Sequence, residues 1–339
     1  MQKKSVKQQH YVPRVYLRRF TIDGERLYVY DKIKDEIRGP ENIKNVAQER
    51  FFYDLPVDTI PSNLDPQAEE KALSELEGQF HVAIEAALRV VEGKGADLHE
   101  RMLMSWFVAV QIVRTRAYRN QLVEMATTVQ EELLNTLMRV VKPEWAEQLK
   151  AKVNYDDGAA STLHASHMWD KKLLEQLISG IYHHLWIVGI NSTETPLHTS
   201  DNPVVMRSHA SVDSDTENYN WQDRPGLTVA TIEAKLTQPH PLAKGIEIIF
   251  PLTPTCALIM LDREHFSYLE TRQGQGYFLN EDQIQDFNRL QAEQSERQIF
   301  SSKNDLESAR AISQSAKSSG IKKGYELDIQ IHHQFENLQ

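Results

Sequence analysis

The stretch Met102–Val113 reads MLMSWFVAVQIV and is closed by Arg101 and Arg114. It is apolar on nearly every side, which is typical of a helix in the middle of a helical layer. Crossing a bilayer takes about 20 apolar residues, so this run is too short to span a membrane. We therefore expect a buried core helix that starts near Asp97.

Helical patterns continue on both sides of this stretch. Apolar residues recur at three- and four-residue steps from Leu73 to Val91, which predicts an amphipathic helix. Further helices are expected over 122–141, 143–150, 170–183 and 281–300. Residues 154–166 are polar and aperiodic and predict a loop, and the long polar run 207–226 predicts a mobile loop or lid.

Strand patterns lie on both sides of the helical region along the chain. Alternating, β-branched or aromatic residues predict strands over 26–30, 35–38, 184–190, 245–250, 256–261 and 325–332. Helices gathered in one region, with strands before and after them, favour an α+β fold over alternating βαβ units. We expect a central helical layer packed on a mixed or antiparallel sheet formed from the N-terminal and C-terminal parts of the chain.

A single composite domain is expected over residues 1–339. Its expected parts are N-terminal strands with a basic segment in 1–60, the helical layer in 66–183, strands and a late helix in 184–300, a polar linker in 301–324 and a terminal strand in 325–332.

Charge and cysteine content limit the class of protein. Lys and Arg number 38 against 48 Asp and Glu, a net charge of −10, which excludes a strongly basic nucleic-acid coat. Residues 1–22 nevertheless carry basic side chains and no acid, so either an anionic partner lies near them or they balance an acidic body. The lone Cys256 can form no intrachain disulfide and is expected to be inert packing, and no signal peptide is recognisable, which indicates the cytoplasm.

His10 is the first candidate for chemistry. A histidine beside basic residues can act as a general base or, when protonated, bind phosphate. The alternative is that His10 and Tyr11 anchor the N-terminal segment through hydrogen bonds, with Pro13 fixing the turn.

Arg114 is the second candidate, on one face of the apolar helix with Gln111. A buried arginine needs an anionic partner, so Arg114 could clamp an anionic substrate. It could equally form a structural ion pair with a glutamate of the preceding helix, and the available residues are Glu69, Glu75 and Glu77.

Asp201 is the third candidate, within Thr199–Pro203 (TSDNP). A carboxylate at the end of a strand is well placed to serve as a base or a metal ligand, with His198 as a helper on the same strand. The alternative is that Ser200, Asp201 and Asn202 cap a turn through their own backbone. Asn288 in the late helix is similarly ambiguous.

Several well-known motifs are missing from the sequence. It contains no HExxH, GxxxxGK[ST] or GxSxG pattern, which disfavours zinc proteases, P-loop proteins and serine hydrolases, and no dinucleotide-binding loop.

The opening His10-Tyr11-Val12-Pro13, continued by Tyr16-Leu17 and Phe20, resembles the HYxPxxYLxxF signature of the bacterial domain-of-unknown-function family 4238. Further similar segments are Phe51-Phe52-Tyr53, Gln111-x-x-Arg114-Thr115, Thr199–Val204, Pro251–Pro254 and Asn288. The resemblance spans roughly residues 8–301. It implies that the chain is related to this family, but it implies no particular reaction.

Two classes of function remain open at this point. The first is a hydrolase for an anionic, phosphate-containing substrate, nuclease-like and compatible with a defence effector, in which His10, Asp201 and Arg114 are catalytic. Asp201 with Glu77 could hold Mg²⁺ or Mn²⁺, and the substrate-binding candidates are Tyr11, Gln111, Ser200, Asn202 and Asn288. The second class is a non-catalytic module that senses a small anionic ligand or binds a protein. Either class allows an anionic small molecule or nucleic acid as partner, and neither involves a membrane.

Overall fold

The structure is a computed structural model that describes residues 6–56, 65, 67–89, 97–146, 149–210, 216–224, 227–236, 240–318 and 327–332. In 216–224, 227–236 and 327–332 only the backbone is described.

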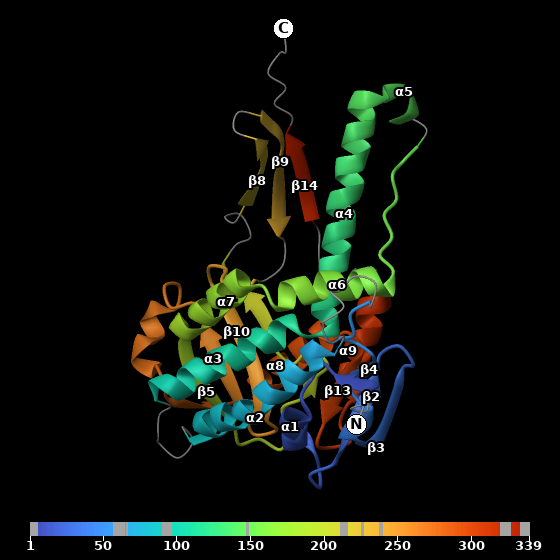
Figure 1. The fold of residues 1–339 in the computed structure, drawn as a ribbon. Helices are drawn as coiled ribbons and strands as arrows, with labels where there is room; N and C mark the ends of the chain where they lie inside the picture. The colour runs from blue at the N-terminus through green and yellow to red at the C-terminus, as the bar shows by residue number, and fades with distance from the viewer. Residues whose placement is uncertain are drawn as a thin grey trace.

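A helical layer covers one side of the molecule (Figure 1). Its members are α2 (Ala68–Leu88), α3 (Leu98–Val113), α6 (Asp157–Met168) and α7 (Lys171–His183). Between α3 and α6 the chain forms α4 (Arg116–Val141) and α5 (Pro143–Ala146). The apolar helix α3 packs against α2 and α7, as a helix without a polar face requires. Asp97 begins it in a capping box with Glu100, and the Thr115 side chain begins α4, so two separate caps divide the long helical run.

A five-stranded sheet lies behind these helices. Its strand order is β12 (Gly276–Leu279), β5 (Leu185–Asn191), β11 (Cys256–Leu261), β10 (Ile246–Thr253) and β7 (Val205–Ser208). Only β12 runs parallel to its neighbour β5, and the other pairs are antiparallel. The strands predicted over 245–250 and 256–261 are neighbours in this sheet.

A second sheet joins strands from the N-terminal part of the chain to strands from its second half. Its order is β3 (Glu36–Asn42), β2 (Arg26–Asp31), β13 (Gln298–Ser301) and β6 (Thr199–Ser200), all antiparallel. The N-terminal hairpin therefore pairs with a strand from the late part of the chain. Helices packed on mixed and antiparallel sheets confirm the α+β fold.

Smaller elements complete the body of the molecule. They are β1 (Gln8–His10) paired with β4 (Gln48–Arg50), α1 (Arg14–Leu17), the 3₁₀ turns at Arg18–Phe20, Ile43–Asn45 and Ser267–Arg272, α8 (Glu281–Gln294) and α9 (Glu307–Ser318).

One part projects from this body. Helix α4 rises away from it, and a three-stranded antiparallel sheet of β8 (Thr216–Arg224), β9 (Leu227–Leu236) and β14 (Leu327–His332) stands beside it, with β14 in contact with α4 (Figure 1). No helix in the described part of the chain combines the length and the apolar content that a membrane crossing requires.

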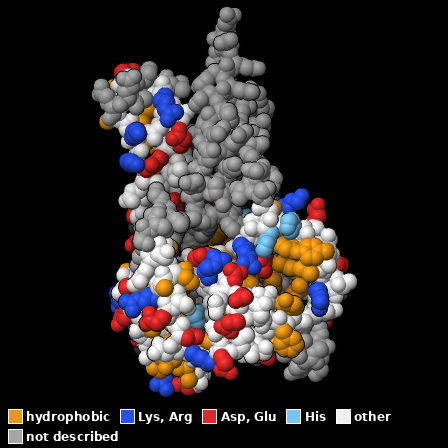
Figure 2. Space-filling view, turned by 180° about the vertical axis from the view of Figure 1, so that it is seen from behind, with side chains coloured by type: hydrophobic (Ala, Val, Ile, Leu, Met, Phe, Trp, Pro, Cys, Tyr) orange, Lys and Arg blue, Asp and Glu red, His pale blue; other side chains and the backbone are white. Residues whose placement is uncertain are grey.

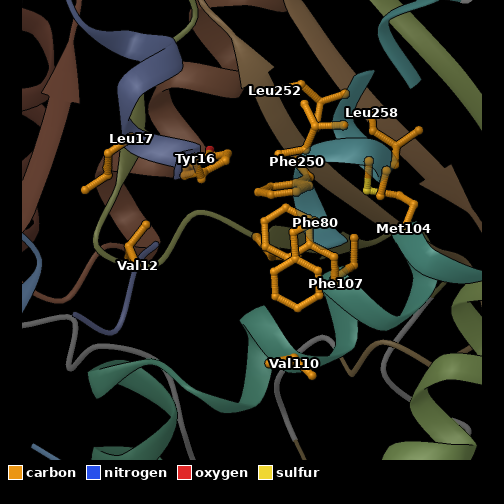
Figure 3. Close-up of a cluster of buried hydrophobic side chains, with 14 of the residues drawn as sticks. Val12, Tyr16, Leu17, Phe80, Met104, Phe107, Val110, Phe250, Leu252 and Leu258 are labelled. Carbon is orange, nitrogen blue, oxygen red and sulfur yellow. The ribbon is translucent and has the colours of Figure 1, made fainter. Parts of the chain in front are cut away.

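An aromatic cluster joins the helices to the five-stranded sheet (Figure 3). Phe80 of α2 stacks on Phe107 of α3 with ring centroids 4.2 Å apart, and Phe250 of β10 lies 5.5 Å from Phe107. Tyr16 stacks on Phe250 at 5.1 Å, and its hydroxyl donates to the carbonyl of Pro251 at 2.7 Å. Tyr16 and Leu17 of the opening motif are therefore core residues.

Four sequence predictions differ from the structure. Residues 154–166 were expected as a loop but contain α6, whose first turn is capped by Asp156. The expected mobile loop over 207–226 contains β8, the expected linker over 301–324 contains α9, and the helix expected over 281–300 ends at Gln294, before β13. The parts of these segments at 211–215, 225–226 and 319–324 lie outside the described residues.

Candidate functional site

Arg114 lies at the end of α3, is only 1% exposed and joins three segments of the chain. Its Nη2 donates to the backbone carbonyl of His10 at 2.7 Å and to Glu77 Oε1 at 3.0 Å. Its Nε lies 3.3 Å from the hydroxyl of Tyr53, which itself donates to the Arg114 carbonyl. This geometry is that of the structural ion pair with the preceding helix, with Glu77 as the partner.

His10 and its neighbours form the other side of this contact. His10 Nε2 lies 3.3 Å from the carbonyl of Ile43, and burial, with the charges of Arg14 and Arg114 close by, lowers the pKa of His10 to about 4. The Tyr11 amide donates to the Ala47 carbonyl, and Gln111 Nε2 donates to the Tyr11 carbonyl at 3.1 Å. A histidine neutral at pH 7 brings no positive charge to a phosphate, so this arrangement fits an anchor for the N-terminal segment.

Asp201 is fully buried and binds backbone amides. Its Oδ1 accepts from the amide of Glu296 at 2.9 Å, and its Oδ2 accepts from the amides of Arg297 at 2.7 Å and Gln298 at 2.9 Å. Burial raises the pKa of Asp201, and these amides oppose the shift because they stabilise the charged form. The carboxylate thereby holds the segment between α8 and β13.

Ser200, Asn202 and Asn288 connect the same turn to α8. Ser200 Oγ donates to Gln291 Oε1 at 2.7 Å, and Asn202 Nδ2 donates to the carbonyl of Gln294 at 3.0 Å. Asn288 Oδ1 accepts from the amide of His198 at 2.7 Å.

The predicted site residues therefore fall into two groups. The first surrounds Arg114 and includes His10, Tyr11, Gln111 and Glu77; the second surrounds Asp201 and includes Ser200, Asn202 and Asn288. The two groups are close to each other at Tyr11 and Asp201. Burial is the main cause of the raised pKa of Tyr11, and the negative charge of Asp201 is the second. Asp201 and Glu77 each have their own partners, and the described residues contain no group of three or more His, Cys, Asp or Glu that could hold a metal ion.

Two glutamates in the first turn of α2 have raised pKa values. Burial raises the pKa of Glu69 to about 7, against the opposing charge of Arg119, and raises the pKa of Glu70 to about 7, against that of Arg114. From the sequence, Glu69 is only a possible partner for Arg114 and nothing marks Glu70, because the burial of a carboxylate on a helix depends on what packs over it.

An open cleft of about 780 Å³ lies along α8 and α9. Three separate segments line it: Glu194, Thr195 and His198 before β6; Glu281, Gln285, Asp286, Asn288 and Arg289 of α8; and Lys303, Asp305, Ser308 and Ile312 in and before α9. Of the predicted site residues, Asn288 and the helper His198 line this cleft.

His198 and Asp305 form a pair in the wall of the cleft. His198 is 1% exposed, and its Nε2 lies 3.3 Å from Asp305 Oδ1, which also accepts from Ser301 Oγ at 2.7 Å. Burial alone would raise the pKa of Asp305, but the contacts with His198 and Ser301 bring it below its usual value. The Nδ1 atom of His198 is buried and has no hydrogen-bond partner within the part of the chain that the structure describes.

Lys303 and Asp305 are not among the predicted site residues, because both lie in the segment predicted as a linker. No motif marks them, and only the pairing of β13 with β2 and β6 brings the segment after β13 to the cleft.

These features define an α+β protein with a polar, charged cleft between its late helices and the turn before β6. The model of the family described as Protein of unknown function (DUF4238) matches residues 8–305, so the chain belongs to that family. Searches of curated proteins and of solved structures gave no match.

Proposed function

We propose that this protein is a non-catalytic ligand-binding module, and that its cleft along α8 and α9 binds a small molecule with an amino or guanidino group. The observation that carries the proposal is the lining of the cleft, where the carboxylates Glu194, Glu281, Asp286 and Asp305 outnumber the cations Arg289 and Lys303. A volume of about 780 Å³ is in the range of small-molecule sites.

The cations of the cleft are already paired with carboxylates. Arg289 contacts Asp286 at 2.6 Å and Glu293 at 2.8 Å, and Lys303 lies 3.7 Å from Glu194. The excess negative charge favours a positively charged ligand group and opposes a phosphate. Asp305 combines a 29% exposed side chain with a contact to the buried His198, so we expect this carboxylate to meet that group.

The state of His198 supports binding over catalysis. A general base needs a ring nitrogen within reach of the proton that it takes. One nitrogen of His198 faces Asp305 and the other is buried, so the ring supports the wall of the cleft. Hydrolysis of a phosphate ester stays a prediction from the sequence. The anionic ligand that the sequence suggests would be repelled by the excess of carboxylates in this cleft.

Calorimetric titration with spermidine and with free arginine tests the proposal, with AMP as the anionic comparison. We expect saturable binding of at least one cationic probe, weakened about tenfold or more in Asp305→Asn because a charge-assisted hydrogen bond is lost. Glu144→Gln, at an exposed position on α5, should bind like the wild type.

Three results would overturn the proposal. They are the absence of binding for both cationic probes, tighter binding of AMP than of either, and hydrolysis of bis(p-nitrophenyl) phosphate that is lost in a folded Asp201→Asn variant. The last result would establish the phosphodiesterase instead.

A further inference from the structure

The edge of the five-stranded sheet at β12 is the strongest unassigned feature of the surface. Strand β12 pairs with β5 on one side, and no described strand pairs with its other side. Unpaired edges are normally short, charged or covered, because they can accept a strand from another chain. This strand is short, with the sequence Gly-Tyr-Phe-Leu, but it carries no charge, and its first three residues are exposed.

Aromatic side chains are exposed along this edge. Phe278 is 70% exposed and Tyr277 is 43% exposed, and Tyr268 in the preceding 3₁₀ turn is 73% exposed. Figure 2 shows hydrophobic side chains gathered on one flank of the molecule, next to histidine side chains. Directly before the 3₁₀ turn, His265 and Phe266 have ring centroids 4.8 Å apart. Exposed aromatic patches of this kind mark interaction sites.

We propose that a second copy of this chain binds here, with the two β12 strands antiparallel across a two-fold axis. The two sheets would then continue into one another, and the aromatic side chains of each copy would cover those of the other. The same patch on both subunits is the usual form of a two-fold interface. This proposal is independent of the ligand in the cleft.

Charge at the two ends of the strand favours a second copy as the occupant. Arg272 precedes β12 and Asp282 follows it, each five positions from Tyr277, and both are exposed. Neither forms an ion pair among the residues that the structure describes. Arg272 ends the 3₁₀ turn before β12, and Asp282 lies in the first turn of α8 after it. Antiparallel pairing of the two β12 strands therefore sets the end that carries Arg272 in one copy beside the end that carries Asp282 in the other, twice per dimer. An extended peptide from another protein would need matching charges of its own.

Analytical ultracentrifugation of the full chain over a range of concentrations tests this interface. We expect a monomer–dimer equilibrium in which Phe278→Asp, Arg272→Asp and Asp282→Arg each weaken the dimer about tenfold or more, because each places like or unpaired charge in the contact. The double variant Arg272→Asp/Asp282→Arg restores opposite charges and should recover affinity to within about threefold of the wild type.

Arg18→Asp, an exposed arginine away from this edge, is the matched control and should leave the dimer unchanged. The proposal is overturned by a wild type that stays monomeric at every concentration, by single variants that dimerise like the wild type, or by a double variant no better than the single ones. The charge variants decide the outcome even if Phe278→Asp does not fold.

Discussion

At the scale of single residues, Asp201 shows how a carboxylate in a motif can serve the fold. Its two oxygens accept from the amides of Glu296, Arg297 and Gln298, so they satisfy donors that follow the end of α8. Buried amides without an acceptor would destabilise the fold. Several hydrogen-bond donors also offset the free-energy cost of burying the carboxylate. We therefore expect even a small chemical change of the Asp201 side chain to lower the free energy of unfolding.

Asp201→Asn should lower the free energy of unfolding by about 2–4 kcal/mol, because the new amide group must face backbone N–H donors. Urea unfolding measures the change, with the exposed Asp157→Asn as a control that should shift stability by less than about 0.5 kcal/mol. Unchanged stability in Asp201→Asn would contradict the structural role.

Glu70 gives a prediction for the dependence of stability on pH. Its pKa is about 7 in the folded protein against 4.5 for an ordinary glutamate. Because the folded value is the higher one, the stabilisation from protonated Glu70 is complete below pH 4.5 and is lost as the pH rises through 7.

The free energy of unfolding of Glu70→Gln should therefore rise relative to the wild type by about 1–3 kcal/mol between pH 4.5 and pH 8. His10 and His164, whose pKa values are lowered to about 4 and about 3 chiefly by burial, act in the opposite direction but are present in both proteins, so the difference isolates Glu70. Urea unfolding at a series of pH values gives the comparison, with exposed Glu75→Gln as control. A difference that does not change with pH would refute the burial of this carboxylate.

The chemistry of single residues was only partly predictable from the sequence. The ion pair of Arg114 with a glutamate of the preceding helix followed from the cost of burying an arginine, and the structure assigns it to Glu77. That Asp305 faces His198 could not be predicted, because their 3.3 Å contact joins residues far apart in the chain.

At the scale of elements, Arg114 connects β1 and α2 to the junction between α3 and α4. Its side chain reaches His10 on β1 and Glu77 on α2, and its backbone carbonyl accepts from Tyr53. The contact thus fixes the N-terminal segment, with its HYVP sequence, against the helical layer.

Arg114→Lys should destabilise the protein by about 2–4 kcal/mol, because an ammonium group cannot reach all the partners of the guanidinium and leaves buried polar groups unpaired. The partly exposed Arg116, which pairs with Glu49 near the surface, is the matched control. Arg116→Lys should change stability by less than about 1 kcal/mol in the same thermal or urea unfolding experiment. Equal effects of the two substitutions would contradict the bridging role.

Elements with a strong apolar pattern were predicted well. The helices α2, α3 and α7 and the strands β5, β10 and β11 lie where periodicity and β-branched content indicate. Helices α6 and α9 were missed because few of their residues are apolar, and each depends on packing contacts such as His164 in α6 and Ala309 in α9. The sequence predicts one helix over both α8 and β13. Only Ser295, which caps the end of α8, indicates that the helix stops before the strand begins.

At the scale of the whole molecule, the pairing of β13 between β2 and β6 organises the candidate site. It brings the turn before β6, the late helix α8 and the start of α9 together around one cleft. The α+β class and the joining of N-terminal and C-terminal strands in one sheet were predictable from the order of patterns. The cleft was not, because its charged lining comes from three segments that only the fold brings together.

Hydrogen exchange measured by mass spectrometry, with and without spermidine, tests the central claim that this cleft binds the ligand. We predict slower exchange confined to peptides that cover 194–198, 281–289 and 303–312, and no such change in Asp305→Asn. Protection centred on 8–14 and 111–118, around His10 and Arg114, or no protection anywhere, would contradict the account.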